Sequence, residues 1–170
     1  MFKKPIMRYR IPRSNRKLAD MRNSTSFSAA STIGILYCSG SLERHHAIKT
    51  FVAHLESVGK KVVVLTYLGK GKDNHEFLFN YFTRKDFSGW GNIDNKHISD
   101  FIEQPFDFIY CMDFNLNLYM KYILALCKAK CRIGAYSEEN NPFYELMVKP
   151  TEKSTASLIT SMQHYTRSIN

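Results

Sequence analysis

The chain has 170 residues, of which 44% are hydrophobic and 14% aromatic. This is the size and composition of one globular domain, and it excludes a disordered chain. No apolar stretch approaches the roughly 18 residues of a membrane span, and the N-terminus lacks the apolar region of a secretory signal peptide. The four cysteines lie in or beside apolar runs and form no C-x-x-C pair, so we expect reduced, buried thiols and no metal site. They are Cys38, Cys111, Cys127 and Cys131.

The net charge of +9 is concentrated at the start of the chain. Residues 1–22 hold eight lysines and arginines against Asp20 alone, a net charge of +7, and the rest of the chain carries only +2. A Ser-, Thr- and Asn-rich stretch follows. We interpret residues 1–31 as a basic arm and linker, and residues 32–170 as a single α/β domain. An organellar transit peptide has a similar basic, Ser-rich composition.

Two prolines, Pro5 and Pro12, argue against one continuous helix from the start of the chain. Ser14 predicts a short helix instead, with Leu18 and Met21 on it. Because every predicted strand and apolar helix stripe follows residue 31, we expect the body to fold without the arm.

From residue 32 the apolar pattern predicts a β-α-β unit. Residues 32–37 form a short β-branched strand, and Ser41 can cap the helix that follows. Gly59 is placed to end this helix, before a second strand at 62–67. The helix has one apolar stripe at helical spacing. Its members are Ile48, Phe51, Val52, Leu55 and Val58.

Further strands and helices alternate along the rest of the chain. We predict strands at 77–82, 106–112, 131–134 and 144–148, and a long loop over 83–92. Asn95, Asn115 and Ser154 are predicted caps of three more helices, the last with Leu158, Ile159, Met162 and Tyr165 turned inward. Short apolar strands separated by helices are typical of an open, mainly parallel sheet with helices on both faces. The predicted fold class is therefore α/β, flavodoxin-like or Rossmann-like.

In such a fold, ligands bind beyond the carboxyl ends of the strands, where the strand order reverses. The candidate ligand loop comprises Ser39, Gly40 and Ser41 after the first strand and Asp113 and Asn115 after a central one. Backbone N–H groups of residues 39–41 could hold an anion, and Asp113 could act as a general base or bind a ribose. The alternatives are an ordinary βα turn with a serine cap, and an Asp113 that caps a helix or is solvated at the rim. Neither G-x-G-x-x-G nor the P-loop pattern is present.

Two further features have a structural and a functional interpretation. His45 and His46 are adjacent, so on a helix their rings diverge, which favours a solvated face over a metal site. Trp90, in a segment that also holds Arg84, Lys85 and Phe87, could stack on nucleic-acid bases. More often such a Trp folds back as a plug over the core, and we expect that arrangement.

Several segments resemble an uncharacterised family of small Bacteroidota proteins, a domain of unknown function. The resemblance rests on Gly34-Ile35-Leu36, on residues 59–62, on 82–86 with Trp90, on Phe106-Asp107, and on residues 129–134 and 143–147. It implies a basic N-terminal segment before an α/β body and a bacterial cytoplasmic protein, and it transfers no activity. Residues 106–109 and 129–134 are more faintly similar to the N-terminal domain of heptosyltransferase-type glycosyltransferases, which also need a second Rossmann-like domain.

Two functions remain. The first is a non-enzymatic binding protein whose arm contacts RNA phosphates, with the ribosome as one candidate partner and Tyr9 available for stacking. The alternative interpretation of the basic arm is a tail that keeps the protein soluble and has no partner. The second is a small nucleotide- or sugar-nucleotide-binding enzyme that uses the loops at the strand ends. No catalytic constellation or cofactor motif is visible. The predicted phosphate contacts are Lys3, Lys4, Arg8, Arg10, Arg13, Arg16, Lys17 and Arg22.

Overall fold

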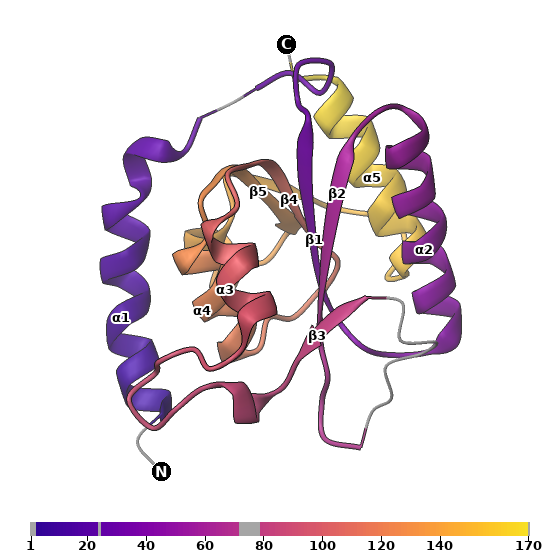
Figure 1. The fold of residues 1–170 in the computed structure, drawn as a ribbon. Helices are drawn as coiled ribbons and strands as arrows, with labels where there is room; N and C mark the ends of the chain where they lie inside the picture. The colour runs from indigo at the N-terminus through magenta and orange to yellow at the C-terminus, as the bar shows by residue number, and fades with distance from the viewer. Residues whose placement is uncertain (1–2, 24, 72–78, 170) are drawn as a thin grey trace.

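The computed structural model describes residues 3–23, 25–71 and 79–169 and contains a six-stranded sheet in the order β3-β2-β1-β4-β5-β6. Every neighbouring pair of strands in it is parallel. The order reverses between β1 and β4, which defines the switch point of a Rossmann-like sheet (Figure 1). The predicted fold class is confirmed. The strands are β1 (Thr32–Cys38), β2 (Lys61–Tyr67), β3 (Asn80–Phe82), β4 (Phe106–Cys111), β5 (Ala129–Ala135) and β6 (Leu146–Val148).

Helices cover both faces of the sheet. On one face α2 and α5 pack together over Ile35 of β1 and Phe108 of β4. On the other face α3 and α4 pack over Leu36 and Ile109 of the same two strands, and α1 lies outside α4 (Figure 1). Successive strand residues serve opposite cores, which is why the central strands are apolar at almost every position. The helices are α1 (Lys3–Lys17), α2 (Leu42–Ser57), α3 (Lys96–Glu103), α4 (Leu118–Leu126) and α5 (Thr155–Arg167).

The helix ends follow local side-chain chemistry. The side chains of Ser41, Asn95 and Ser154 accept hydrogen bonds from the first-turn amides of α2, α3 and α5, so these three predicted caps are confirmed. Gly59 follows α2 with φ +80°, as its predicted role requires. The cap of α4 is Asn117, two residues after the predicted Asn115. The Asn117 side chain accepts hydrogen bonds from the backbone N–H groups of Tyr119 and Met120, so the predicted cap at Asn115 is wrong by two residues.

The N-terminal segment differs from the sequence prediction. Residues 3–17 form one continuous helix, α1, with Pro12 inside it and Ser14 in its last turn. Pro5 falls in the first turn, where no intrahelical N–H bond is lost. Pro12 is exposed, so water can bind the backbone carbonyl that its missing N–H leaves unpaired. The expected short helix capped by Ser14 is therefore wrong, and Met21 lies in a separate 3-10 turn, Ala19–Met21.

Helix α1 packs against the body. Met7 is fully buried and Ile11 is 8% exposed, and both belong to the apolar cluster formed by α3 and α4. Behind α1, helix α4 buries Tyr122, Leu124 and three further side chains, because the sheet covers one side and α1 the other (Figure 1). The basic segment is thus a docked helix rather than an extended arm. That residues 32–170 fold alone stays a prediction, and this packing argues against it.

Smaller differences concern the ends of elements. Tyr165, predicted to face inward, is 48% exposed, whereas Leu158, Ile159 and Met162 are buried as predicted. Val58 lies just beyond α2 and is exposed. Within the predicted loop 83–92, the Arg84–Asp86 segment forms a 3-10 turn capped by Thr83. Strand β3 covers only the end of the predicted 77–82 strand, and residues 77 and 78 lie outside the described residues. No helix in the described part of the chain is both long and apolar enough to span a membrane.

Candidate nucleic-acid interface

At the switch point, Asp113 follows β4 and is 6% exposed. Its carboxylate accepts a hydrogen bond from the backbone N–H of Cys38 at 2.7 Å and pairs with the Arg44 guanidinium of α2 at 2.9 Å. Burial raises the pKa of the Asp113 carboxyl, while Arg44 and the Cys38 N–H act in the opposite direction. Arg44 also donates to the backbone carbonyl of Met112. Asp113 therefore ties β1, β4 and α2 together, and both expectations for it, helix cap and solvated rim, are wrong.

The other residues of the predicted ligand loop are less enclosed. Ser41 uses its side chain to cap α2, and Gly40 packs beside the Arg44 side chain. Asn115 is exposed. A groove of about 560 Å³ lies between the first turns of α2 and α5, lined by Ser41, Arg44 and Lys153 among others. Ser39, Gly40, Ser41 and Asp113 thus gather at one edge of the sheet, where Asp113 is engaged by protein groups.

The buried titratable side chains nearby are structural. His45 was expected on a solvated face but is 3% exposed, with its Nδ1 atom 3.4 Å from the Tyr37 hydroxyl. Of the two adjacent histidines, His46 is the exposed one. The four thiols are free, and Cys111 and Cys131 are buried, which raises the pKa of each to about 12. Among the described residues, no three His, Cys, Asp or Glu side chains group as a metal site would require.

The outer surface of α1 carries the predicted phosphate contacts. Arg8, Pro12 and Arg16 follow one another at intervals of four residues, as do Tyr9, Arg13 and Lys17, so they lie in two adjacent rows on the helix. These six residues line a single open hollow of about 810 Å³. We call this surface, together with Lys4, the α1 basic face; its cations are Lys4, Arg8, Arg13, Arg16 and Lys17. All five are exposed, and in the described part of the chain none has an acidic side chain within ion-pair distance.

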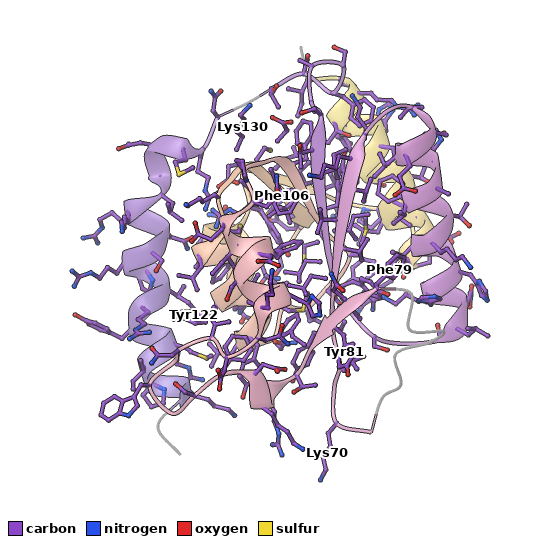
Figure 2. All side chains as sticks on the ribbon, viewed as in Figure 1. Lys70, Phe79, Tyr81, Phe106, Tyr122 and Lys130 are labelled. Atoms are coloured by element: carbon purple, nitrogen blue, oxygen red, sulfur yellow. The ribbon has the colours of Figure 1, made fainter. Side chains whose placement is uncertain are left out.

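Two of the predicted contacts are engaged inside the molecule instead. Arg10 donates to the Gly91 carbonyl at 3.4 Å and to the Tyr122 hydroxyl at 3.3 Å, which joins α1 to α4 (Figure 2). Arg22 has a side chain only 9% exposed, pairs with Glu145 and donates to the Ala129 carbonyl. Neither lies on the α1 basic face. The side chain of Lys3 lies outside the described residues.

An exposed tryptophan stands beside this helix. Trp90 is 75% exposed, so the expectation that it plugs the core is wrong, and Phe87 from the same segment is the fully buried residue. The next residue, Gly91, is buried with φ +74° and lies against Ile6 and Arg10 of α1. The loop at 87–93 therefore abuts the N-terminal half of α1 and holds Trp90 outward.

A second groove borders the α1 basic face. It has a volume of about 400 Å³ and lies between α1, the start of α4 and the Glu138–Phe143 turn. Its walls are apolar at Ile11, Leu116 and Phe143, and Lys121 pairs there with Glu139. The Lys121 ammonium also lies 5.7 Å from the centre of the Phe143 ring.

Arg132 anchors the other end of α1, a role that was not predicted from the sequence. Arg132 of β5 is 4% exposed and forms a 2.6 Å ion pair with Glu145. The same guanidinium donates to the Asn15 side chain of α1 at 2.8 Å and to the Leu124 carbonyl of α4 at 2.9 Å. An arginine in the middle of an apolar strand was the available signal, because a charge there needs buried partners.

The sequence comparisons agree with this view of α1. The profile of a family described as "Family of unknown function (DUF6913)" matches residues 3–169. The chain belongs to this family. The match begins at residue 3 and therefore includes helix α1. The search of curated proteins found no match.

Proposed function

We propose that this DUF6913 protein is a non-enzymatic RNA-binding protein that contacts RNA phosphates through the α1 basic face. The observation that carries the proposal is the division of α1 into two faces. Met7 and Ile11 hold the helix on the body, and five cations on the other face have no acidic partner among the described residues. When unpaired cations along a helix bind a phosphate chain, they displace the counterions condensed on that chain, so binding is favoured at low salt.

The geometry favours RNA over a membrane surface. A helix that binds lipid inserts an apolar face into the bilayer, with basic residues at its border. In α1 the apolar residues Met7 and Ile11 already face the protein core. The outward surface offers Tyr9 and Pro12 among its cations, and none of the residues that line it is a leucine, isoleucine, valine or methionine. A helix spanning Lys4 to Lys17 is on the order of 20 Å long, enough to follow several phosphates of a strand.

The test compares two triple variants of equal charge. Arg8→Gln, Arg13→Gln and Arg16→Gln together remove three cations of the α1 basic face, and Arg10 is kept because it anchors the helix. Lys61→Gln, Lys70→Gln and Lys149→Gln remove three exposed cations elsewhere and change the net charge equally. Binding to a fluorescent single-stranded RNA is measured by anisotropy from 50 to 200 mM salt, with circular dichroism to confirm folding.

We expect the α1 variant to bind at least 10-fold more weakly at 50 mM salt, because three phosphate contacts are lost. The slope of log K against log salt should fall in magnitude by about 2. The matched control should retain the wild-type slope. Equal effects of the two triples, or wild-type binding that does not change with salt, would refute the proposal, as would tighter binding to anionic vesicles than to RNA.

The same measurements separate the alternative function, a small nucleotide- or sugar-nucleotide-binding enzyme. Its support is the groove between the first turns of α2 and α5, where Arg44 and Lys153 lie beside the ligand loop. Under that function a nucleotide would bind tightly, and the α1 triple would bind it as wild type does. Ribosome association is read from the same two variants, by their distribution between ribosomal and free fractions of a lysate.

A further inference from the structure

We infer that the nucleic acid bound by the α1 basic face is single-stranded, with unpaired bases stacked on Tyr9 and Trp90; this rests on the proposed function. Phosphate contacts alone do not distinguish a strand from a duplex. Aromatic side chains do, because the bases of a duplex are already stacked on one another and only unpaired bases offer a free face.

Tyr9 is placed within the row of cations. Its side chain is 71% exposed and lines the same hollow as Arg8, Arg13 and Arg16. It makes no ring contact with another aromatic residue of the described chain. A base stacked on Tyr9 would have its phosphate within reach of the arginines on either side, an arrangement typical of proteins that bind single strands.

Trp90 is held in place by the loop that carries it. The Gly91 carbonyl accepts hydrogen bonds from the Tyr122 hydroxyl at 3.0 Å and from Arg10 of α1. The Ser88 amide donates to the Asn92 carbonyl at 2.9 Å, and its hydroxyl accepts from the Asn92 amide at 3.0 Å. These bonds fix the loop on both sides of Trp90 and attach it to α1. The backbone that carries the indole is therefore fixed, so the loop loses little conformational entropy when a base stacks on Trp90.

Trp90 and Tyr9 follow one another along the α1 basic face. Gly91 lies against Ile6 and Arg10, the immediate neighbours of the turn that carries Tyr9. Trp90 thus stands beside the N-terminal half of the α1 basic face, and the cations Arg13, Arg16 and Lys17 continue from Tyr9 toward its C-terminal end. A strand that follows the helix would meet Trp90, then Tyr9, then these cations.

The experiment uses the intrinsic fluorescence of the chain, because Trp90 is its only tryptophan. The full chain is titrated with three probes: a 12-nucleotide uridine RNA, an abasic deoxyribose-phosphate oligomer of equal length, and a 12-base-pair RNA duplex. We expect the uridine strand to quench Trp90 emission and to bind on the order of 10-fold tighter than the abasic strand. The abasic strand and the duplex should bind through phosphates without quenching.

Variants measured by anisotropy assign the effect to the two side chains. Trp90→Ala and Tyr9→Ala should each weaken binding of the uridine strand on the order of 10-fold and leave binding of the abasic strand unchanged. Trp90→Phe should restore most of the loss, since Phe retains a face for stacking. Tyr165→Ala, which removes an exposed aromatic ring from α5, is the matched control and should have no effect.

Failure of the inference differs from failure of the proposed function. Equal affinity for the uridine and abasic strands, without quenching and with no effect of Trp90→Ala, would overturn the inference but leave phosphate binding by α1 intact. Tighter binding of the duplex than of the uridine strand would do the same. If none of the three probes binds, the proposed function fails and the inference falls with it.

Discussion

At the scale of single residues, buried polar groups in this protein tie elements together. Asp107 at the start of β4 is 8% exposed and accepts hydrogen bonds from the backbone amides of Ser31 and Thr32 at 2.7 and 3.1 Å. Its other oxygen pairs with Lys130 of β5 at 2.7 Å (Figure 2). Asp107 thus fixes the start of β1 and the neighbouring β5 to β4, at the sheet edge opposite Asp113.

Asp107 makes the free energy of unfolding depend on pH in the acid range. Burial alone would raise its pKa, but the hydrogen bonds from Lys130, Ser31 and Thr32 outweigh it and lower the pKa to about 2. A carboxylate with a lowered pKa stabilises the fold above its unfolded pKa of 3.8, and this contribution is lost as pH falls from about 4 to 2. We expect Asp107→Asn to lower the free energy of unfolding by about 2 kcal/mol at pH 7. Urea unfolding at pH 7 and at pH 2 to 3 measures this, and an equal loss at both pH values would contradict it.

Gly134 of β5 is required by a close contact. A Cβ atom at this position would lie 2.1 Å from Cζ of Tyr144, whose side chain is itself buried. We expect Gly134→Ala to cost about 3 kcal/mol of stability or more, because the Tyr144 ring has no room to shift. Gly89→Ala is the matched control: nothing lies within 4 Å of its added Cβ, and the change should stay within about 0.5 kcal/mol. Denaturant unfolding of both variants decides the matter.

At the scale of elements, α1 and α4 depend on each other. The sequence of α4 is apolar on nearly all sides, a pattern that indicates a helix covered on both faces. The sheet lies against its inner side, and α1 covers its outer side. The apolar sequence of 118–126 was therefore the signal that an additional element had to dock there.

This dependence predicts the effect of breaking the contact. Met7→Asp places a charge in the apolar cluster between α1 and α4, and we expect a loss of about 3 kcal/mol or more. Tyr9→Asp, two residues away on the exposed face, should change stability by less than about 1 kcal/mol. Urea unfolding measures both. A truncated chain of residues 32–170 that unfolds cooperatively at the wild-type midpoint would show instead that the body does not need α1.

At the scale of the whole molecule, the cysteines report on how much of the fold opens at once. Three cysteines are buried: Cys111 lies in β4, Cys127 directly follows α4, and Cys131 lies in β5. Cys38, at the end of β1, is partly accessible. Burial raises the pKa of each thiol, so little thiolate is present at pH 8 even where reagent can reach it.

We therefore expect iodoacetamide at pH 8 to label four thiols in urea and at most Cys38 in the native protein. Labelling of the other three should follow the urea dependence of global unfolding, because they lie in the two cores that share the sheet. Mass spectrometry of the labelled protein gives both numbers. Fast native labelling of Cys131 alone would show that β5 and β6 open separately from the rest.

Features that depend on neighbours along the chain could be predicted from the sequence. The alternation of strands and helices, the caps Ser41, Asn95 and Ser154, the glycine after α2 and the inward stripe of α2 all arise from periodicity and from bonds that span a few residues. The concentration of positive charge in residues 1–22 was equally visible, and the prediction of RNA as a partner rests on it.

Which distant residues meet depends on the folded chain and could not be predicted in this way. Asp113 is bound by Arg44, 69 positions earlier in the chain. A residue predicted to lie in a ligand loop therefore links two elements of the fold instead. Phe87 is buried and Trp90 is exposed, although both are aromatic residues of one loop. Arg10 and Arg22 turn inward while their basic neighbours face solvent. In each case the sequence supplies side chains that can serve either purpose, and burial against residues far along the chain selects one.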